Sequence, residues 1–318
     1  MITMQSRYEG AMLGLAVGDA LGWPVEFMSL AAIRGRYGPE GLSELVSSDS
    51  HRAGTFTDDT QMSLALARAI LSRGRDDEAK YIAEVAREFV AWSRSPENNR
   101  APGNTCMVGC RELARDLAWR APGHNASKGC GTAMRTAPIG LAWHGDEDRI
   151  TRMAAETSAL THGHPAAIAG GVATALLVHW ALGAVEPAEM LRRLVERTRT
   201  ISDEFVAKIE QVPAVLDYEP ESAYAVLGDA WVADEAIACA LYAFWRSPND
   251  YHSTVVTAVN MDGDSDSVGC IAGAISGAYN GAEAIPPHWR QTVEQADELV
   301  GVARQLLDFT SGRESHRS

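Results

Sequence analysis

The sequence predicts an all-α protein that folds as a single compact domain, and three observations support this. Apolar residues recur at helical spacing along most of the chain, and no run alternates in the manner of a half-buried β-strand. The 318 residues are 46% hydrophobic and 22% charged, an ordinary globular composition that can bury a sizeable core. No repeat, heptad run or Pro/Ser-rich linker divides the chain. We therefore expect one domain over residues 1–310 and a disordered tail over 311–318.

The first predicted helix, residues 7–21, carries glycine at every fourth position from Gly10 to Gly22. Glycine costs about 1 kcal/mol relative to alanine inside a helix, so such a stripe indicates that another backbone or a ligand comes very close. The same stripe recurs from Gly269 to Gly281, in a helix predicted over 267–280. The two helices are therefore predicted to be neighbours at the middle of the molecule.

Residues 23–57 are predicted to form a long loop with one short helix around 30–34, and loops of this length are uncommon unless functional. A second polar, glycine-rich loop is predicted at 121–131, and Pro138 should bend or interrupt the helix after it. The other helices are predicted, in order, at 60–73, 78–94, 105–119, 132–143, 147–160, 165–183, 187–199, 202–210, 231–246, 250–259 and 289–308.

Charge and cysteine usage restrict the partners and the compartment. The net charge of −14 argues against nucleic acid, because phosphate binding needs a basic face. The five cysteines form no CxxC and no paired framework, which favours a reducing cytosol. Residues 1–9 lack the features of a signal peptide, and the apolar stretches at 10–18 and 268–278 are shorter than the about 20 residues of a bilayer span. We expect a soluble, cytoplasmic monomer that binds neither nucleic acid nor membrane.

Two acidic clusters each stand before an apolar helix: residues 57–60 (TDDT) and residues 262–267 (DGDSDS). One such cluster is typical of a helix N-terminus, where side-chain oxygens accept from free N–H groups and the dipole favours negative charge. Two clusters with hydroxyl neighbours also offer the oxygen ligands that Mg²⁺ and Mn²⁺ prefer. The residues alone leave both interpretations open, and the second requires the clusters to meet in space.

Five segments in this order make the chain resemble the ADP-ribosylglycohydrolase family, the DraG- and ARH-like hydrolases of ADP-ribosylated acceptors. They are residues 10–26 (GAMLGLAVGDALGWPVE), 57–60 (TDDT), 125–140 (NASKGCGTAMRTAPIG), 161–165 (THGHP) and 263–267 (GDSDS), and they span nearly the whole chain. The resemblance implies a compact orthogonal all-α fold with a central cleft. It also implies a pair of divalent cations, Mg²⁺ or Mn²⁺, at the base of that cleft.

Carried over position by position, the resemblance assigns metal ligands and catalytic residues. The implied ligands are Thr57, Asp58, Asp59, Asp264, Asp266 and Ser267, and the implied catalytic residues are Glu26, Asp58 and Asp266. Asp266 is expected to bridge the two cations, and Ser267 stands where the family usually has threonine. Glu26 is expected to act as a general acid/base or to hold a water at the metals. Without the resemblance, a glutamate after Trp-Pro is more often an exposed loop acid.

The resemblance also assigns substrate contacts, to Asn104, Ser127, Lys128, Gly129, Cys130, Gly131 and His162. Residues 127–131 are expected to wrap the diphosphate and ribose with backbone N–H groups, with charge added by Lys128; composition alone favours a plain surface turn. Many relatives have asparagine in place of Cys130, and no base is assigned that would make this thiol a nucleophile. His162 is expected beside the ribose, or else as a structural histidine. His164 is expected to start a helix, and Arg135 to be structural.

The implied reaction is metal-dependent hydrolysis of the glycosidic bond that joins ADP-ribose to a modified protein side chain. The cations would orient the ribose hydroxyls and activate a water, and Glu26 would manage the proton. ADP-ribosyl-arginine is the first choice of substrate, with Asn104 near the acceptor. Three alternatives remain: O-linked ADP-ribose (on serine, or O-acetyl-ADP-ribose), a metal-dependent nucleotide phosphohydrolase, and a non-catalytic ADP-ribose-binding or immunity protein.

Overall fold

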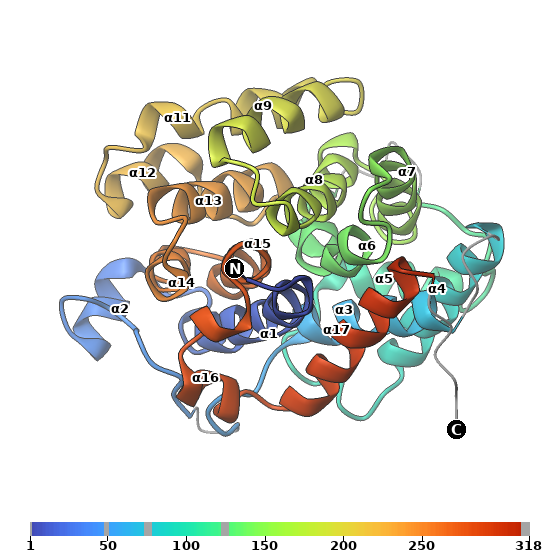
Figure 1. The fold of residues 1–318 in the computed structure, drawn as a ribbon, viewed down its shortest axis with the longest axis horizontal. Coiled ribbons are helices and arrows are strands. Elements are labelled where there is room, and N and C mark those ends of the chain that lie inside the picture. Colours follow the sequence, from blue (N-terminus) through green and yellow to red (C-terminus); the bar gives the residue numbers. More distant parts are fainter. Residues whose placement is uncertain (1, 48–50, 73–77, 122–126, 313–318) are drawn as a thin grey trace.

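The computed structural model describes residues 2–47, 51–72, 78–121 and 127–312, and within these ranges it contains helices and no β-strand (Figure 1). The α-helices of the first half are α1 (Met4–Gly22), α2 (Leu30–Tyr37), α3 (Asp58–Leu71), α4 (Glu78–Ser93), α5 (Asn104–Leu113), α6 (Ala137–Ala142), α7 (Glu147–Ser158) and α8 (Pro165–Leu182). Those of the second half are α9 (Pro187–Thr198), α10 (Asp203–Ile209), α11 (Val212–Val215), α12 (Pro220–Leu227), α13 (Ala233–Arg246), α14 (Tyr251–Val259), α15 (Ser265–Asn280), α16 (Pro287–Thr292) and α17 (Ala296–Thr310). Three short 3-10 helices complete the set: η1 (Trp23–Val25), η2 (Cys130–Arg135) and η3 (Ala282–Ala284). The all-α prediction is confirmed.

The two glycine-striped helices, α1 and α15, pack along their whole length, as predicted. A Cβ atom built on Gly14 would lie 2.3 Å from the carbonyl oxygen of Gly273, and one on Gly18 would lie 1.9 Å from that of Gly269. Only glycine permits so close an approach of two backbones. The contact also fixes the register of the helices, so that Gly22, at the end of α1, faces Asp266 at the start of α15.

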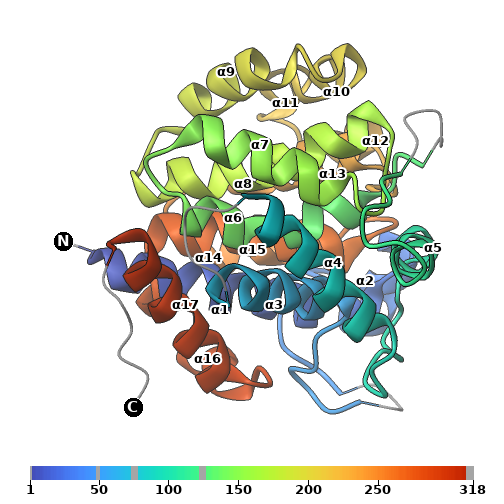
Figure 2. The same ribbon diagram turned by 90° about the vertical axis from the view of Figure 1, so that its right-hand side faces the viewer.

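α15 is the central helix, and every residue in it except the last is buried. It contacts α1, α8, α13 and α14, while α9 and α10 pack on the outer side of α8 and α13 (Figures 1 and 2). One cluster of buried apolar side chains extends from Tyr8 on α1 to Leu306 on α17. The acidic start of α15 is therefore held from several sides.

The predicted helix over 289–308 is wrong as a single element, because the chain forms α16 and α17 with a break between them. Gln295 adopts a left-handed backbone conformation with φ 55°. The backbone N–H of Glu294 donates to the carbonyl oxygen of Gly54 at 2.9 Å, outside any helix. A contact with a distant loop thus interrupts the helix, and the spacing of apolar residues along the sequence does not indicate such a contact.

Other boundaries differ in smaller ways. The helix predicted at 105–119 ends at Leu113, and the short helices α11 and α12 are not predicted from the sequence. Pro138 interrupts the helical run as predicted, since η2 ends at Arg135 and the proline stands in the first turn of α6. The predicted tail begins with Ser311 and Gly312, which follow α17, and residues 313–318 lie outside the described part.

Among the described residues, one helix, α8, is long and apolar enough to cross a membrane by length and composition, and it lies outside the apolar stretches 10–18 and 268–278. Within the protein, 89% of this 18-residue window is buried. α8 packs against α7, α13 and α15, an environment typical of a core helix.

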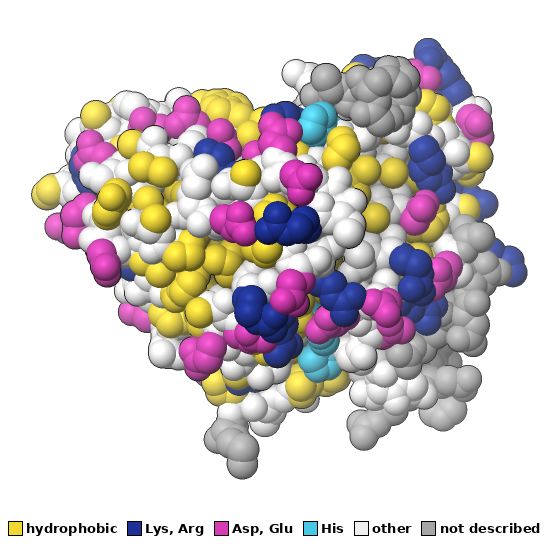
Figure 3. Space-filling view, turned by 90° about the horizontal axis from the view of Figure 1, so that it is seen from above, with side chains coloured by type: hydrophobic (Ala, Val, Ile, Leu, Met, Phe, Trp, Pro, Cys, Tyr) yellow, Lys and Arg dark blue, Asp and Glu magenta, His cyan; other side chains and the backbone are white. Residues whose placement is uncertain are grey.

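Figure 3 shows the face seen from above Figure 1, on which acidic and basic side chains are interleaved. On the outer helix α9, Arg192 forms an ion pair with Glu189, and Arg197 forms one with Asp148 of α7. The described side chains of this face therefore form no continuous basic patch. The expectation that the protein does not bind nucleic acid stays a prediction.

Candidate metal and substrate site

The two acidic clusters meet at the buried ends of α3 and α15, as predicted. The hydroxyl of Thr57 lies 3.3 Å from Oδ2 of Asp266, and Asp59 and Ser267 line the same cavity. Residues about two hundred positions apart thus share one buried site. The glycine contact between α1 and α15 brings a further carboxylate, that of Asp19, to the same place.

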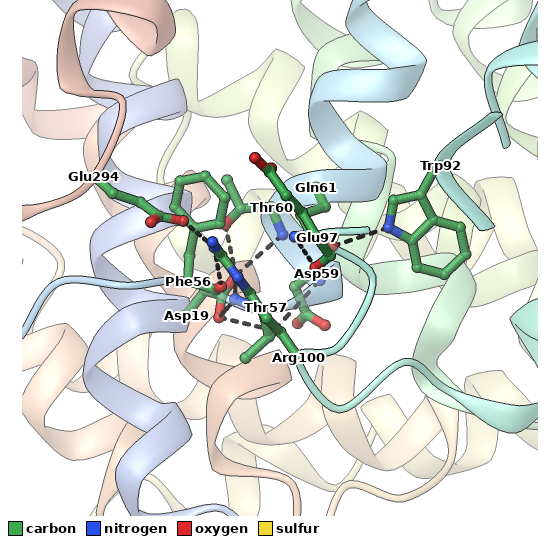
Figure 4. A network of polar contacts seen from close by, with 10 residues as sticks. All are labelled: Asp19, Phe56, Thr57, Asp59, Thr60, Gln61, Trp92, Glu97, Arg100 and Glu294. Carbon is green, nitrogen blue, oxygen red and sulfur yellow. Dashed lines mark hydrogen bonds and ion pairs between the residues drawn. The ribbon is translucent and has the colours of Figure 1, made fainter. Parts of the chain in front are cut away.

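Asp19 anchors the first cluster and was not predicted as a site residue. Its carboxylate accepts from the backbone N–H of Thr57 at 2.9 Å and from that of Thr60 at 3.0 Å, and both hydroxyls donate to it as well (Figure 4). Thr57 is also the N-cap of α3, since its Oγ1 accepts from the N–H of Asp59. The helix-cap interpretation of this threonine is therefore correct, and its role as a cation ligand stays a prediction. The available signal for Asp19 was a single charge in the apolar, glycine-striped stretch 10–22.

A cavity of about 460 Å³ opens over these carboxylates. Its floor and walls are formed by Glu26, Phe27, Asp58, Asp59, Ala101, Pro102, Gly103, Asn104, Thr105, Cys106, Gly129, Cys130, Gly131, Met134, His162, Trp231, Asp264, Asp266 and Ser267. Most of the predicted site residues are among them. Neither lysine nor arginine is found among these described lining residues.

The carboxylates of the floor are crowded. Glu26, Asp264 and Asp266 each have an oxygen within 4.8 Å of the other two. Burial, followed by the neighbouring carboxylates, raises the pKa of Glu26 to about 9. Burial also raises the pKa of Asp58 to about 8, and the pKa values of Asp59 and Asp266 lie well above their usual range for the same reason. Such a cluster is costly unless positive charge compensates it.

The donor set fits a hard divalent cation. Asp58, Asp59, Asp264, Asp266 and Ser267 offer carboxylate and hydroxyl oxygens on one cavity floor, which are the ligands of Mg²⁺ and Mn²⁺. The Oδ2 atom of Asp59 is buried and has no hydrogen-bond partner. An unpaired buried carboxylate oxygen is unusual and needs an explanation, such as an ion that belongs there.

Glu26 follows η1 and faces the cavity, so it is not the exposed loop acid that its neighbours in the sequence suggest. The next residue, Phe27, has a left-handed backbone conformation with φ 63°, and its N–H donates to the carbonyl oxygen of Gly263 at 2.8 Å. This bond joins the segment after α1 to the second acidic cluster. It thereby sets the position of the Glu26 carboxylate over Asp264 and Asp266.

His162 is buried in a hydrogen-bond chain with Arg135 and Thr161. Nη2 of Arg135 donates to the hydroxyl of Thr161 at 2.7 Å, and that hydroxyl lies 2.8 Å from Nδ1 of His162. The other ring nitrogen, Nε2, lies beside Gly129 in the cavity wall. Burial, with Arg135, lowers the pKa of His162 to about 3. The imidazole is therefore neutral at physiological pH, and Nε2 can form a hydrogen bond with a substrate hydroxyl. Arg135 is structural, as predicted.

Cys130 lies between the loop and the acidic floor. Its half-buried thiol donates to Oδ2 of Asp264 at 2.8 Å and lies 3.6 Å from the hydroxyl of Ser267. Burial and the Asp264 carboxylate raise the pKa of this thiol well above its usual value. A protonated thiol is a poor nucleophile, which agrees with the prediction that Cys130 is none.

Three residues near the site direct their side chains elsewhere. Lys128 forms an ion pair with Glu204 on α10, and Ser127 bonds to the hydroxyl of Thr105 at 2.8 Å; neither lines the cavity. The exposed Asp262, part of the second cluster, accepts from the N–H of Leu30 at the start of α2. The charge expected from Lys128 at a diphosphate therefore has no support in its position. Residues 122–126 of this loop lie outside the described part.

The mouth of the cavity carries features that sequence reasoning missed. Phe27 and Trp231 stack with ring centroids 4.9 Å apart and planes at 11°, although 58% and 48% of their surfaces are exposed. Asn104, the first residue of α5, is exposed on the same cavity wall, as expected for an acceptor contact. Nothing in the sequence separates these two aromatic residues from core ones. His164, by contrast, caps α8 through Nδ1, which accepts from the N–H of Ala166, as predicted.

Fold and site together define an all-α enzyme whose carboxylates, from segments far apart in the sequence, converge on the floor of a cavity. The chain belongs to the ADP-ribosylglycohydrolase family, whose profile matches residues 1–316. It is a hydrolase of that family, as predicted.

Several relatives match over almost the whole chain. An uncharacterized protein of Archaeoglobus fulgidus is 32% identical, over 96% of this chain and 97% of its own length. The ADP-ribosyl-[dinitrogen reductase] glycohydrolase of Rhodospirillum rubrum is 30% identical, over 95% and 98%. The ADP-ribosylarginine hydrolase Tri1 of Pseudomonas putida is 29% identical, over 95% and 78%. A solved structure titled ADP-ribosylglycohydrolase-related protein complex superposes with a TM-score of 0.78 at 29% identity, over 96% of this chain and 99% of that one.

Proposed function

We propose that this protein is a divalent-cation-dependent hydrolase that removes ADP-ribose from modified arginine side chains of proteins. The observation that carries the proposal is the cluster of Glu26, Asp264 and Asp266, with oxygens within 4.8 Å of one another on a cavity floor shared with Asp58 and Asp59. Two cations, Mg²⁺ or Mn²⁺, suit this oxygen-only floor. When bound, they supply charge that orients ribose hydroxyls and lowers the pKa of a water.

The residues of the chain then have separate tasks. Asp58, Asp59, Asp264 and Asp266 hold the positive charge. The hydroxyl of Thr57 lies beside Asp266, and Ser267 lines the same cavity. Glu26 stands at the same floor from a different segment. The positive charge held there lowers its raised pKa, so its carboxylate can receive a proton from the attacking water and return it to the departing group.

His162 and the glycine loop, residues 127–131, recognise the ADP-ribose part of the substrate. Nε2 of His162 offers one hydrogen-bonding group to the substrate, and Gly129 and Gly131 lie against the imidazole ring. A Cβ atom on Gly131 would lie 2.7 Å from the sulfur of Cys106, so this backbone closely follows the cavity wall. With lysine and arginine missing from the described lining residues, backbone N–H groups and the cations are left to meet the diphosphate.

Arginine is favoured as the departing group by two features of the mouth. The stacked rings of Phe27 and Trp231 offer a flat surface to a guanidinium, and Asn104 offers a carbonyl oxygen. The Pseudomonas putida relative named as an ADP-ribosylarginine hydrolase supports the same choice. The second candidate is O-linked ADP-ribose, because Asn104 supplies no charge to pair with a guanidinium.

The test is hydrolysis of arginine- and serine-ADP-ribosylated peptides by the full chain, with and without EDTA and with Mg²⁺ or Mn²⁺ restored. We expect ADP-ribose release from the arginine peptide, loss of activity in EDTA, and no turnover by Asp58→Ala or Asp266→Ala with the helical circular dichroism retained. Asp262→Asn is the matched control, an acid of the same cluster outside the cavity, and should keep wild-type turnover.

Each rival predicts a different product. Release from the serine peptide alone would move the assignment to O-linked substrates. Release of phosphate from ADP-ribose would favour a nucleotide phosphohydrolase, and binding of ADP-ribose without any turnover would favour a binding or immunity role. Wild-type turnover by Asp58→Ala, or in EDTA, would overturn the cation mechanism.

A further inference from the structure

The segment between α4 and α5 forms one wall of the cavity and also touches the acidic floor. Ala101, Pro102 and Gly103 line the cavity directly before α5. The backbone N–H of Gly103 donates to Oδ2 of Asp58 at 3.1 Å. The orientation of the Asp58 carboxylate therefore depends on where this segment lies.

Arg100 holds that segment against the chain that leads into α3. Its Nη1 donates to the carbonyl oxygen of Phe56 at 3.1 Å, and the same nitrogen forms an ion pair with Glu294 (Figure 4). The side chains of Arg100 and Glu294 are only 14% and 9% exposed. Phe56 directly precedes Thr57, so Arg100 acts on the acidic floor from both sides: through Phe56 and through Gly103.

Glu294 is itself fixed independently of Arg100. Its N–H donates to the carbonyl oxygen of Gly54, and a Cβ atom on Gly54 would lie 2.3 Å from the carbonyl oxygen of Thr292. Gly54 also has φ +82°, a backbone conformation that other residues rarely adopt. The break between α16 and α17 thus serves to present a carboxylate beside the segment 54–57.

A second set of hydrogen bonds holds the start of the segment between α4 and α5. Nε2 of Gln61, on α3, donates to the carbonyl oxygen of Glu97 at 3.1 Å, and its Oε1 accepts from Nε1 of Trp92 at 3.0 Å (Figure 4). The wall is therefore anchored at Glu97 and again at Arg100, and the second anchor is the one next to the residues that line the cavity.

We propose that Arg100 and Glu294 are positioning residues for the cation site. Neither lines the cavity. Their ion pair clamps Phe56 to the segment that carries Gly103, and this fixes the backbone of Thr57 and the carboxylate of Asp58 in the geometry that binds a cation. The inference rests on the proposed function, because it requires Asp58 to be a cation ligand.

Mn²⁺ binding to the full chain, stripped with EDTA and followed by titration calorimetry, tests this without reference to activity. Arg100→Ala should weaken Mn²⁺ affinity roughly 10- to 100-fold, the range seen when residues that orient metal ligands are lost. Glu294→Gln should weaken it less, because the amide keeps an acceptor for Arg100. Arg100→Lys should keep more affinity than Arg100→Ala, since both bonds leave from a single nitrogen. In turnover assays kcat should fall while KM for the peptide stays near wild type.

Arg68→Ala is the matched control, because Arg68 on α3 forms an ion pair with Glu298 on α17 that touches no part of the cavity. It should bind Mn²⁺ like wild type. Wild-type affinity in both Arg100→Ala and Glu294→Gln would overturn the inference. If Arg100→Ala does not fold, Glu294→Gln and Arg100→Lys decide by the same readout. Absent binding in wild type, or full binding in Asp58→Ala, would instead refute the proposed function.

Discussion

The floor and the mouth of the cavity are built in different ways. The floor lies on the ends of α3 and α15, where glycine contacts and helix caps leave each carboxylate little freedom. The mouth comprises Phe27, Trp231 and Asn104, all exposed and carried by loops or a helix end. Two relatives have names that specify different substrates, ADP-ribosyl-[dinitrogen reductase] and ADP-ribosylarginine. The contrast in this protein separates a floor fixed by helix contacts from a mouth carried by exposed segments, the parts of proteins that vary most readily.

The largest loss of stability is expected from Gly18→Ala, which adds one methyl group beneath the cavity floor. In Gly18→Ala, the new Cβ would lie 1.9 Å from the carbonyl oxygen of Gly269, and both helices would have to separate. We expect a loss of about 3 kcal/mol or more in the free energy of unfolding, measured by urea denaturation. Cation binding should weaken as well, because Asp19 and Asp266 would move apart.

Gly301→Ala is the control for that substitution. Gly301 lies in α17, and a Cβ atom there would meet nothing within 4 Å. The change should stabilise the protein by up to about 1 kcal/mol, the difference in helix propensity. Equal stability of the two variants would show that the glycine stripe does not define the floor.

A buried polar pair outside both regions should make stability depend on pH. Nδ1 of His144 lies 2.8 Å from Nδ1 of His179, so only one of these nitrogens carries a proton. Burial, then His144, lowers the pKa of His179 to about 4; Glu147 opposes this, and Arg193 and Arg197 add to it. Burial also lowers the pKa of His144.

Because the folded pKa of His179 is below its unfolded value, its contribution is complete above about pH 6.5 and is lost as pH falls toward 4. A shift of this size corresponds to at most about 3 kcal/mol. Urea denaturation of wild type and His179→Gln between pH 7.5 and 4.5 should show a steeper loss in wild type. Parallel curves would contradict the prediction, and Mn²⁺ affinity at neutral pH should be the same in both proteins.

The mouth should respond to mutation in binding rather than in stability. Trp231→Ala removes a ring that is 48% exposed and stacked on Phe27, so little core packing is lost. We expect KM for an ADP-ribosylated arginine peptide to rise roughly 5-fold, about 1 kcal/mol of aromatic and cation–π contact, with kcat nearly unchanged. Tyr218→Ala is the control, an aromatic residue with the same 48% exposure that does not line the cavity. An unchanged KM in Trp231→Ala would show that the mouth of the cavity does not take part in substrate recognition.

The same contrast explains what the sequence could predict. Local sequence patterns indicate the floor, because acids and hydroxyls precede helices and glycines recur every four residues. The contact between residues 57–60 and 262–267 can therefore be predicted from the sequence. Phe27 and Trp231 have no such signal, because their exposure follows from the positions of distant segments. The helix predicted over 289–308 is interrupted for the same reason. The backbone N–H of Glu294 donates to the carbonyl oxygen of Gly54, and no local sequence pattern indicates this contact.

The smallest effect is expected from Lys128, next to the glycine loop. The resemblance assigns it a role at the diphosphate, whereas the structure pairs it with Glu204 on α10, away from the cavity. An ion pair this exposed contributes about 0–1 kcal/mol. Lys128→Ala should therefore leave kcat, KM and the free energy of unfolding near wild type, with Glu204→Gln equally mild. A large rise in KM in Lys128→Ala alone would mean that the lysine leaves Glu204 when substrate binds, and that the mouth rearranges while the floor does not.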